Sequence, residues 1–93
     1  MLAYATLGTR DLAKAAAFYD AVLAPLAAKR FMEEPDYFIA WGNSEAGAGL
    51  GITYPFDKQA ATVGNGCMVA LGASSREQVD AVYAKAIELG GSD

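Results

Sequence analysis

The chain has 93 residues, which is enough for one domain with a single hydrophobic core. Hydrophobic residues make up 54% of the sequence, the formal net charge is −4 and the seven basic residues are scattered singly, which excludes a disordered chain and argues against nucleic acid as a partner. No apolar run approaches the roughly 20 residues that cross a bilayer, and no signal-peptide pattern opens the chain, so we expect no membrane contact and a cytoplasmic location.

Residues 2–8 alternate in the manner of a strand, with Tyr4 on one face and the smaller Ala5 and Leu7 on the other. Thr9 or Asp11 can then cap a helix. The apolar positions that follow recur at helical spacing and predict an amphipathic helix that ends near Pro25.

The next stretch predicts three strands. Two strand-like runs are separated by a turn at residues 34–36, where proline disfavours helix, and Phe38 and Trp41 fall on opposite faces of the second run. Residues 42–49 predict another turn, and residues 50–56, which contain Tyr54, predict the next strand. Residues 1–56 therefore predict a βαβββ unit.

A second unit begins after a polar linker at residues 57–65. The apolar run at 67–73 predicts a strand, and the run beginning at Ser74–Ser75 predicts a capped helix that stops at Gly90–Gly91. The order strand then capped helix repeats the start of the chain, so residues 66–93 predict an unfinished second copy of the first unit.

The chain contains no histidine and one cysteine, Cys67. Imidazole is the commonest ligand for zinc and the usual general base near neutral pH, so the common metal sites and a Cys–His catalytic pair are excluded. Cys67 is expected to be a small buried residue.

The segment "TRDLAKAAAFYDAVLAPL" and the later "GNGCMVALGASSREQVDAVYAKAIELGG" resemble the glyoxalase, bleomycin-resistance and extradiol-dioxygenase superfamily, also called vicinal oxygen chelate. The resemblance covers essentially the whole chain. It implies an α+β domain over residues 1–93, with a curved mixed sheet, helices on the convex face and a second module that stops after its first strand and helix.

The resemblance also implies where enzymes of this superfamily place their metal ligands. The first position matches Tyr4, the second falls in "LGITYP", which has no carboxylate, and the third matches Met68. The fourth belongs to the part of the second module that the sequence lacks. Phenol and thioether are weak ligands for such ions, so we expect no metal, no cofactor and no catalytic residue.

Tyr4 therefore has two readings, a pocket wall with a hydroxyl handle or plain core packing. The function that the resemblance favours is a metal-free protein that binds a small planar or aromatic molecule in the cavity of the sheet. The expected ligand-binding residues are Tyr4, Phe38, Trp41, Tyr54 and Met68. Two alternatives stay open: a degenerate or truncated lactoylglutathione lyase or dioxygenase-like enzyme, and a structural protomer without a ligand.

The unfinished second module predicts a partner, because a strand without neighbours leaves an unpaired edge and an apolar face. A homodimer in which two chains complete each other is the expected solution. The alternative is that the sequence is a shortened form of a longer protein.

Overall fold

The computed structural model describes residues 1–34, 36–44 and 47–93. Pro35, in the predicted turn at 34–36, and residues 45–46, in the predicted turn at 42–49, lie outside the described residues. The elements in chain order are β1 (Tyr4–Gly8), α1 (Leu12–Leu23), the 3₁₀ helix η1 (Ala24–Leu26), β2 (Lys29–Glu34), β3 (Phe38–Gly42), β4 (Gly49–Thr53) and α2 (Arg76–Glu88).

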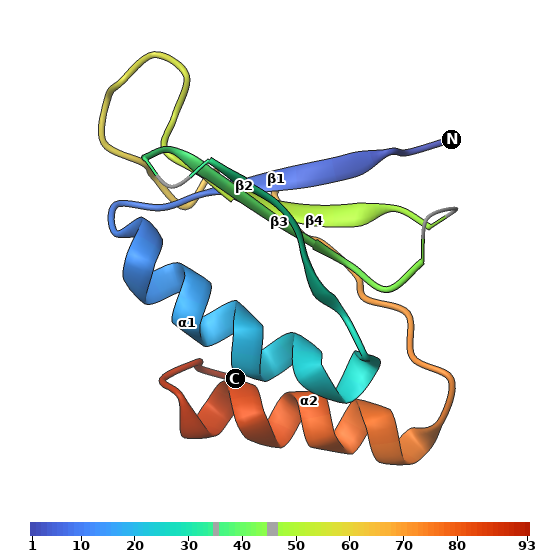
Figure 1. Ribbon diagram of the computed structural model, residues 1–93. Coiled ribbons are helices and arrows are strands. Elements are labelled where there is room, and N and C mark those ends of the chain that lie inside the picture. Colours follow the sequence, from blue (N-terminus) through green and yellow to red (C-terminus); the bar gives the residue numbers. More distant parts are fainter. Residues whose placement is uncertain (35, 45–46) are drawn as a thin grey trace.

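The strands form one mixed sheet in the order β1-β4-β3-β2. β1 runs parallel to β4, whereas the β4–β3 and β3–β2 pairs are antiparallel. Both helices lie on the same side of the curved sheet, with α2 beside α1 (Figure 1). The predicted α+β fold and the βαβββ order of the first unit are confirmed.

The two faces of the sheet differ in character, as the strand alternation predicts. The face toward the helices carries the core, in which Trp41, Leu50 and Ile52 pack against α1. We call the opposite side the open face. Register places these residues on it: Tyr4, Thr6 and Gly8 from β1, Phe38, Ala40 and Gly42 from β3, and Gly49, Gly51 and Thr53 from β4.

α1 begins where the sequence predicts, and Asp11 rather than Thr9 is its N-cap. The Asp11 carboxylate accepts a hydrogen bond from the backbone N–H of Lys14 at 3.0 Å. The helix ends at Leu23, and Pro25 occupies the 3₁₀ turn that follows. Since proline has no N–H to donate, it fits the start of a turn better than the interior of a helix.

The second unit departs from the prediction in two places. Residues 67–73 form no strand, because an apolar extended run needs a hydrogen-bonding neighbour and no described strand pairs with it. Cys67 is exposed rather than buried. α2 forms as predicted, with the Ser75 hydroxyl accepting a hydrogen bond from the Gln78 N–H at 3.2 Å.

Neither helix, in the part of the chain that the structure describes, is long and apolar enough to cross a membrane.

Candidate functional site

Aromatic rings gather on the open face of the sheet. Tyr4, on β1, meets Phe38, on β3, edge to face, with ring centroids 5.9 Å apart and planes inclined by 61°. Phe38 is 9% exposed and Tyr4 is 49% exposed. Phe38 therefore supports the Tyr4 ring from the side, while Tyr4 keeps a surface that a ligand can reach.

Glycines beneath these rings allow them to lie on the sheet. A Cβ atom at Gly49 would stand 2.8 and 2.9 Å from two ring carbons of Phe31, and one at Gly51 would stand 2.8 Å from a ring carbon of Phe38. A Cβ at Gly42 would come within 3.2 Å of the Phe31 ring. The absent side chains thus let the Phe31 and Phe38 rings pack close to the backbone, which is one reason for glycine inside a strand.

A cavity of about 660 Å³ opens on this face. That size falls within the range of small-molecule sites, roughly 300 to 1,000 Å³. Its lining residues are Leu2, Ala3, Tyr4, Phe31, Gly42, Asn43, Ser44 and Gly47. Tyr4 and Phe31 come from the two outer strands of the sheet, β1 and β2, and the Phe31 ring reaches inward over Gly42 and Gly49.

The other three predicted ligand-binding residues lie elsewhere. Trp41 is 1% exposed in the core on the helix side of the sheet. The Tyr54 hydroxyl accepts a hydrogen bond from the backbone N–H of Leu12 at 3.0 Å, so it pairs with the first N–H group of α1. Met68 is 85% exposed and is not among the residues that line the Tyr4 cavity. The structure brings Tyr4 and Phe38 together and leaves Trp41, Tyr54 and Met68 apart from them.

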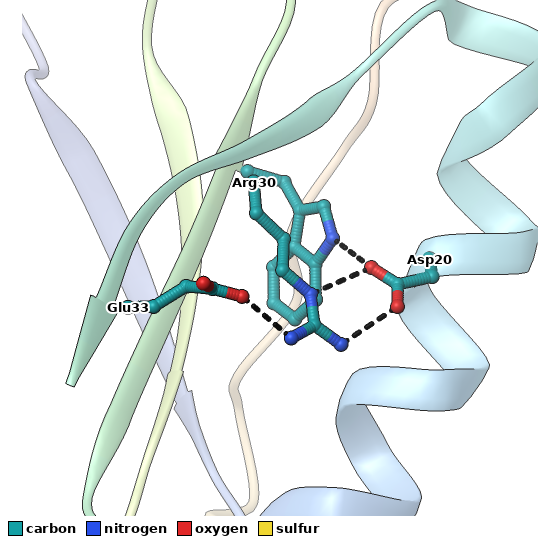
Figure 2. A network of polar contacts seen from close by, with 4 residues as sticks. Asp20, Arg30 and Glu33 are labelled. Atoms are coloured by element: carbon teal, nitrogen blue, oxygen red, sulfur yellow. Dashed lines mark hydrogen bonds and ion pairs between the residues drawn. The ribbon is translucent and has the colours of Figure 1, made fainter. Parts of the chain in front are cut away.

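A polar network on the helix side explains the position of Trp41 (Figure 2). The indole Nε1 of Trp41 donates to Asp20 Oδ1 at 2.8 Å, and Arg30 binds both carboxylate oxygens of Asp20, at 2.9 and 2.7 Å. Arg30 also donates to Glu33 at 2.7 Å, and its guanidinium carbon lies 5.8 Å from the centre of the Trp41 ring. All three guanidinium nitrogens of Arg30 thus donate to the protein's own carboxylates.

Electrostatics within this network favour the charged forms. The hydrogen bonds from Arg30 lower the pKa of the Asp20 carboxyl, and those from Arg30 to Asp20 and Glu33 raise the pKa of the guanidinium. Nearby, burial alone raises the pKa of the Tyr19 hydroxyl. The network is a clamp that joins α1 to β2 and β3.

The open face does not fit the metal ion that enzymes of the resembled superfamily use. β1 and β4 present one phenol, the hydroxyls of Thr6 and Thr53, and glycines, which are weak or absent donors for a divalent ion. Within residues 1–34, 36–44 and 47–93, no three His, Cys, Asp or Glu side chains gather closely enough to hold a metal.

Sequence reasoning missed Phe31 and the glycines beneath the aromatic rings. Phe31 lies at a β-bulge between Arg30 and Met32, so strict alternation along β2 misplaces its side chain. The alternating glycines at 49 and 51 were a usable signal, because both fall on the same face as Tyr4.

Comparison with solved structures finds a close match. The chain is similar to a glyoxalase/bleomycin resistance protein from Albidiferax ferrireducens T118, with a TM-score of 0.84 and 32% sequence identity over 97% of this chain and 72% of that one. No protein-family model and no curated protein matches the chain.

Proposed function

The chain belongs to the glyoxalase/bleomycin resistance protein family, and we propose that it binds a small planar or aromatic molecule on the open face of its sheet without a metal ion. The superfamily is that of the vicinal oxygen chelate proteins. The observation that carries the proposal is the pair of exposed rings, Tyr4 and Phe31, which line one cavity on this face.

The geometry favours a flat guest for a physical reason. Gly42 and Gly49 leave room for the Phe31 ring to lie directly on the sheet, so a planar guest can stack against a ring that the sheet supports. Ring faces and edges attract one another at centroid separations of about 4.5 to 7 Å, which the two exposed rings can offer a third ring.

Each residue has a distinct role in the proposed site. Tyr4 supplies a ring edge and a hydroxyl that can donate or accept a hydrogen bond, while Phe38 fixes the Tyr4 ring. Phe31 supplies a second wall. Trp41 and Tyr54, also expected from the sequence to contact the ligand, lie outside the proposed site, and each makes a hydrogen bond to α1.

Thermal shift with a panel of planar aromatic compounds, such as naphthalene and indole derivatives, tests the proposal. A binder at about 100 times its dissociation constant stabilises the native state by about 2.7 kcal/mol. We expect the shift to disappear in Tyr4→Ala and Phe31→Ala and to persist in Phe56→Ala, the matched control, because Phe56 is a fully exposed ring off this face.

Two results would redirect the assignment. No shift from any ring compound would favour a structural protomer without a ligand. Stoichiometric zinc, nickel, iron or manganese in the purified protein would favour the lyase or dioxygenase-like enzyme. The proposed site offers no strong ligand for those ions, so a bound metal would contradict the metal-free assignment.

A further inference from the structure

The polar side chains of the Tyr4 cavity differ in the hydrogen bonds that they can make. Tyr4, Asn43 and Ser44 are the polar residues of its lining, and no charged side chain lines it in the part of the chain that the structure describes. A hydroxyl group can both donate and accept a hydrogen bond, so Tyr4 and Ser44 suit either kind of guest. An amide whose orientation is fixed offers one kind only, which makes Asn43 the residue that can discriminate.

Asn43 is held in place by a contact with the 3₁₀ helix. It follows directly after β3, and its side-chain Nδ2 donates a hydrogen bond to the backbone carbonyl of Leu26, the last residue of η1, at 3.0 Å. Carbonyl groups at the end of a helix have no partner within the helix, and this amide supplies one. Because a carbonyl oxygen can only accept, the NH₂ end of the amide must face Leu26, which fixes the orientation of the side chain.

The other end of the amide remains available to a guest. Among the described residues, no group donates a hydrogen bond to Asn43 Oδ1, and the Asn43 side chain is exposed and lines the cavity. An amide oxygen has two lone pairs and no hydrogen to give. Asn43 therefore presents an acceptor to the cavity and keeps its donors for Leu26.

This acceptor adjoins the ring on which a flat guest would stack. The Phe31 ring lies over Gly42 and Gly49, where an added Cβ would stand 3.2 Å and 2.8 Å from its carbon atoms. Asn43 is the residue that follows Gly42. A group at the edge of a ring stacked on Phe31 can thus meet the Asn43 amide.

We propose that the guest of this cavity is an uncharged planar molecule whose ring carries an N–H or O–H donor, as an indole or a phenol does. Asn43 Oδ1 accepts the hydrogen bond from that donor, and Phe31 contacts the ring. This inference rests on the proposed function, because it names the class of molecule that the same cavity takes.

Charge disfavours an anionic guest. A carboxylate would bring its oxygens against the Asn43 acceptor and would lose water without gaining a cation, since the described lining of the cavity contains none. Lys29 lies opposite Gly42 in the sheet, but it is exposed on the outer strand and is not among the described lining residues. A neutral donor has a smaller hydration to lose and recovers a hydrogen bond at Asn43.

Matched pairs of guests test the donor by calorimetric titration. Indole and N-methylindole differ by a methyl group in place of the donor hydrogen, as do naphthol and methoxynaphthalene. We expect the donor member of each pair to bind about threefold to tenfold more tightly, which corresponds to one net hydrogen bond. Equal dissociation constants within both pairs would overturn the donor and leave the binding of flat guests intact, whereas no binding of any of the four compounds would overturn the proposed function as well. Tighter binding of naphthoate than of naphthol would also overturn the inference.

Two variants separate the acceptor from the structural contact of Asn43. Asn43→Leu and Asn43→Asp both remove the N–H that Leu26 receives, but only the aspartate keeps an oxygen acceptor. We expect the preference for naphthol over methoxynaphthalene to disappear in Asn43→Leu and to persist in Asn43→Asp. Loss of the preference in Asn43→Asp would show that Asn43 acts only through Leu26 and would overturn the proposal, even where the leucine variant does not fold. A preference that survives in Asn43→Leu would place the acceptor elsewhere, with the same consequence.

Discussion

Residues 4–23 and residues 68–87 follow one pattern, a short strand-like run, a capping side chain and a helix, but only the first segment contributes fully to the core. Four residues of α1 are buried, whereas none of α2 is. The caps and helix starts coincide at a spacing of 64, so the contrast does not come from where the two helices begin. Burial follows from what each segment packs against: β1 and α1 have β4 and β3, and their counterparts have no such strands in the described chain.

The sharpest test of this contrast compares equivalent apolar residues. Leu23 is 2% exposed and its counterpart Ile87 is 40% exposed. Leu23→Ala should cost about 2 to 5 kcal/mol of unfolding free energy, because it opens a cavity in the core. Ile87→Ala should cost less than about 1 kcal/mol, because the Ile87 side chain is already largely in contact with solvent. Urea unfolding measures both, and equal losses would show that α2 is as firmly packed as α1.

Polar anchoring also distinguishes the two helices. Asp20 joins α1 to Trp41 and Arg30, while the equivalent position in α2 is Ala84. Asp20→Ala leaves the indole N–H of the buried Trp41 without its partner, which should cost about 1 to 3 kcal/mol. Asp80→Ala, an exposed aspartate on α2, is the control and should change stability by no more than about 0.5 kcal/mol. Since Trp41 is the only tryptophan, its fluorescence reports the unfolding directly.

The sequence predicts the helices and strands of this protein better than it predicts which elements pair with one another. Strand alternation separates Tyr4 and Phe38 from Trp41, and the cap chemistry of Asp11 and Ser75 locates both helices, because these signals act within a few residues. The failure at 67–73 has the opposite cause. An apolar run favours a strand only if a neighbour supplies the hydrogen bonds, and no property of the run itself reports whether that neighbour exists.

The candidate site is predictable to the same degree. Tyr4 and Phe38 follow from their strands, but the cavity wall formed by Phe31 depends on a bulge, which shifts the alternation along β2. Tyr54 and Trp41 are aromatic residues on the expected strands. Alternation alone places Trp41 on the helix side of the sheet, whereas Tyr54 lies just beyond the end of β4, where its hydroxyl accepts a tertiary hydrogen bond from the Leu12 N–H.

Removal of the N-cap side chain from either helix should cost a similar free energy, but the loss should be detected in different parts of the molecule. Asp11→Ala and Ser75→Ala each delete a side chain that accepts an N–H at the helix start, at a cost of about 1 kcal/mol. Because α1 lies in the core, the loss at Asp11 should appear in global unfolding. The loss at Ser75 should appear mainly as faster amide hydrogen exchange in α2. Faster exchange in α1 and β4 as well would indicate that the two helices unfold as one unit.

The smallest expected effect is a pH dependence that arises from Asp20, which has no counterpart in α2. Its pKa in the folded chain lies below the ordinary value of about 3.9, because Arg30 stabilises the carboxylate. A lowered folded pKa means that the stabilisation is complete above the ordinary value and is lost as the pH falls through the folded pKa. The difference in unfolding free energy between the unaltered chain and Asp20→Asn should therefore stay constant from pH 8 to about pH 5 and shrink below about pH 4. The pair is partly exposed, so salt should reduce the difference at neutral pH. A difference that grows on acidification would mean that the carboxyl is held in its neutral form, and the clamp between α1 and β3 would then depend on the Trp41 hydrogen bond rather than on charge.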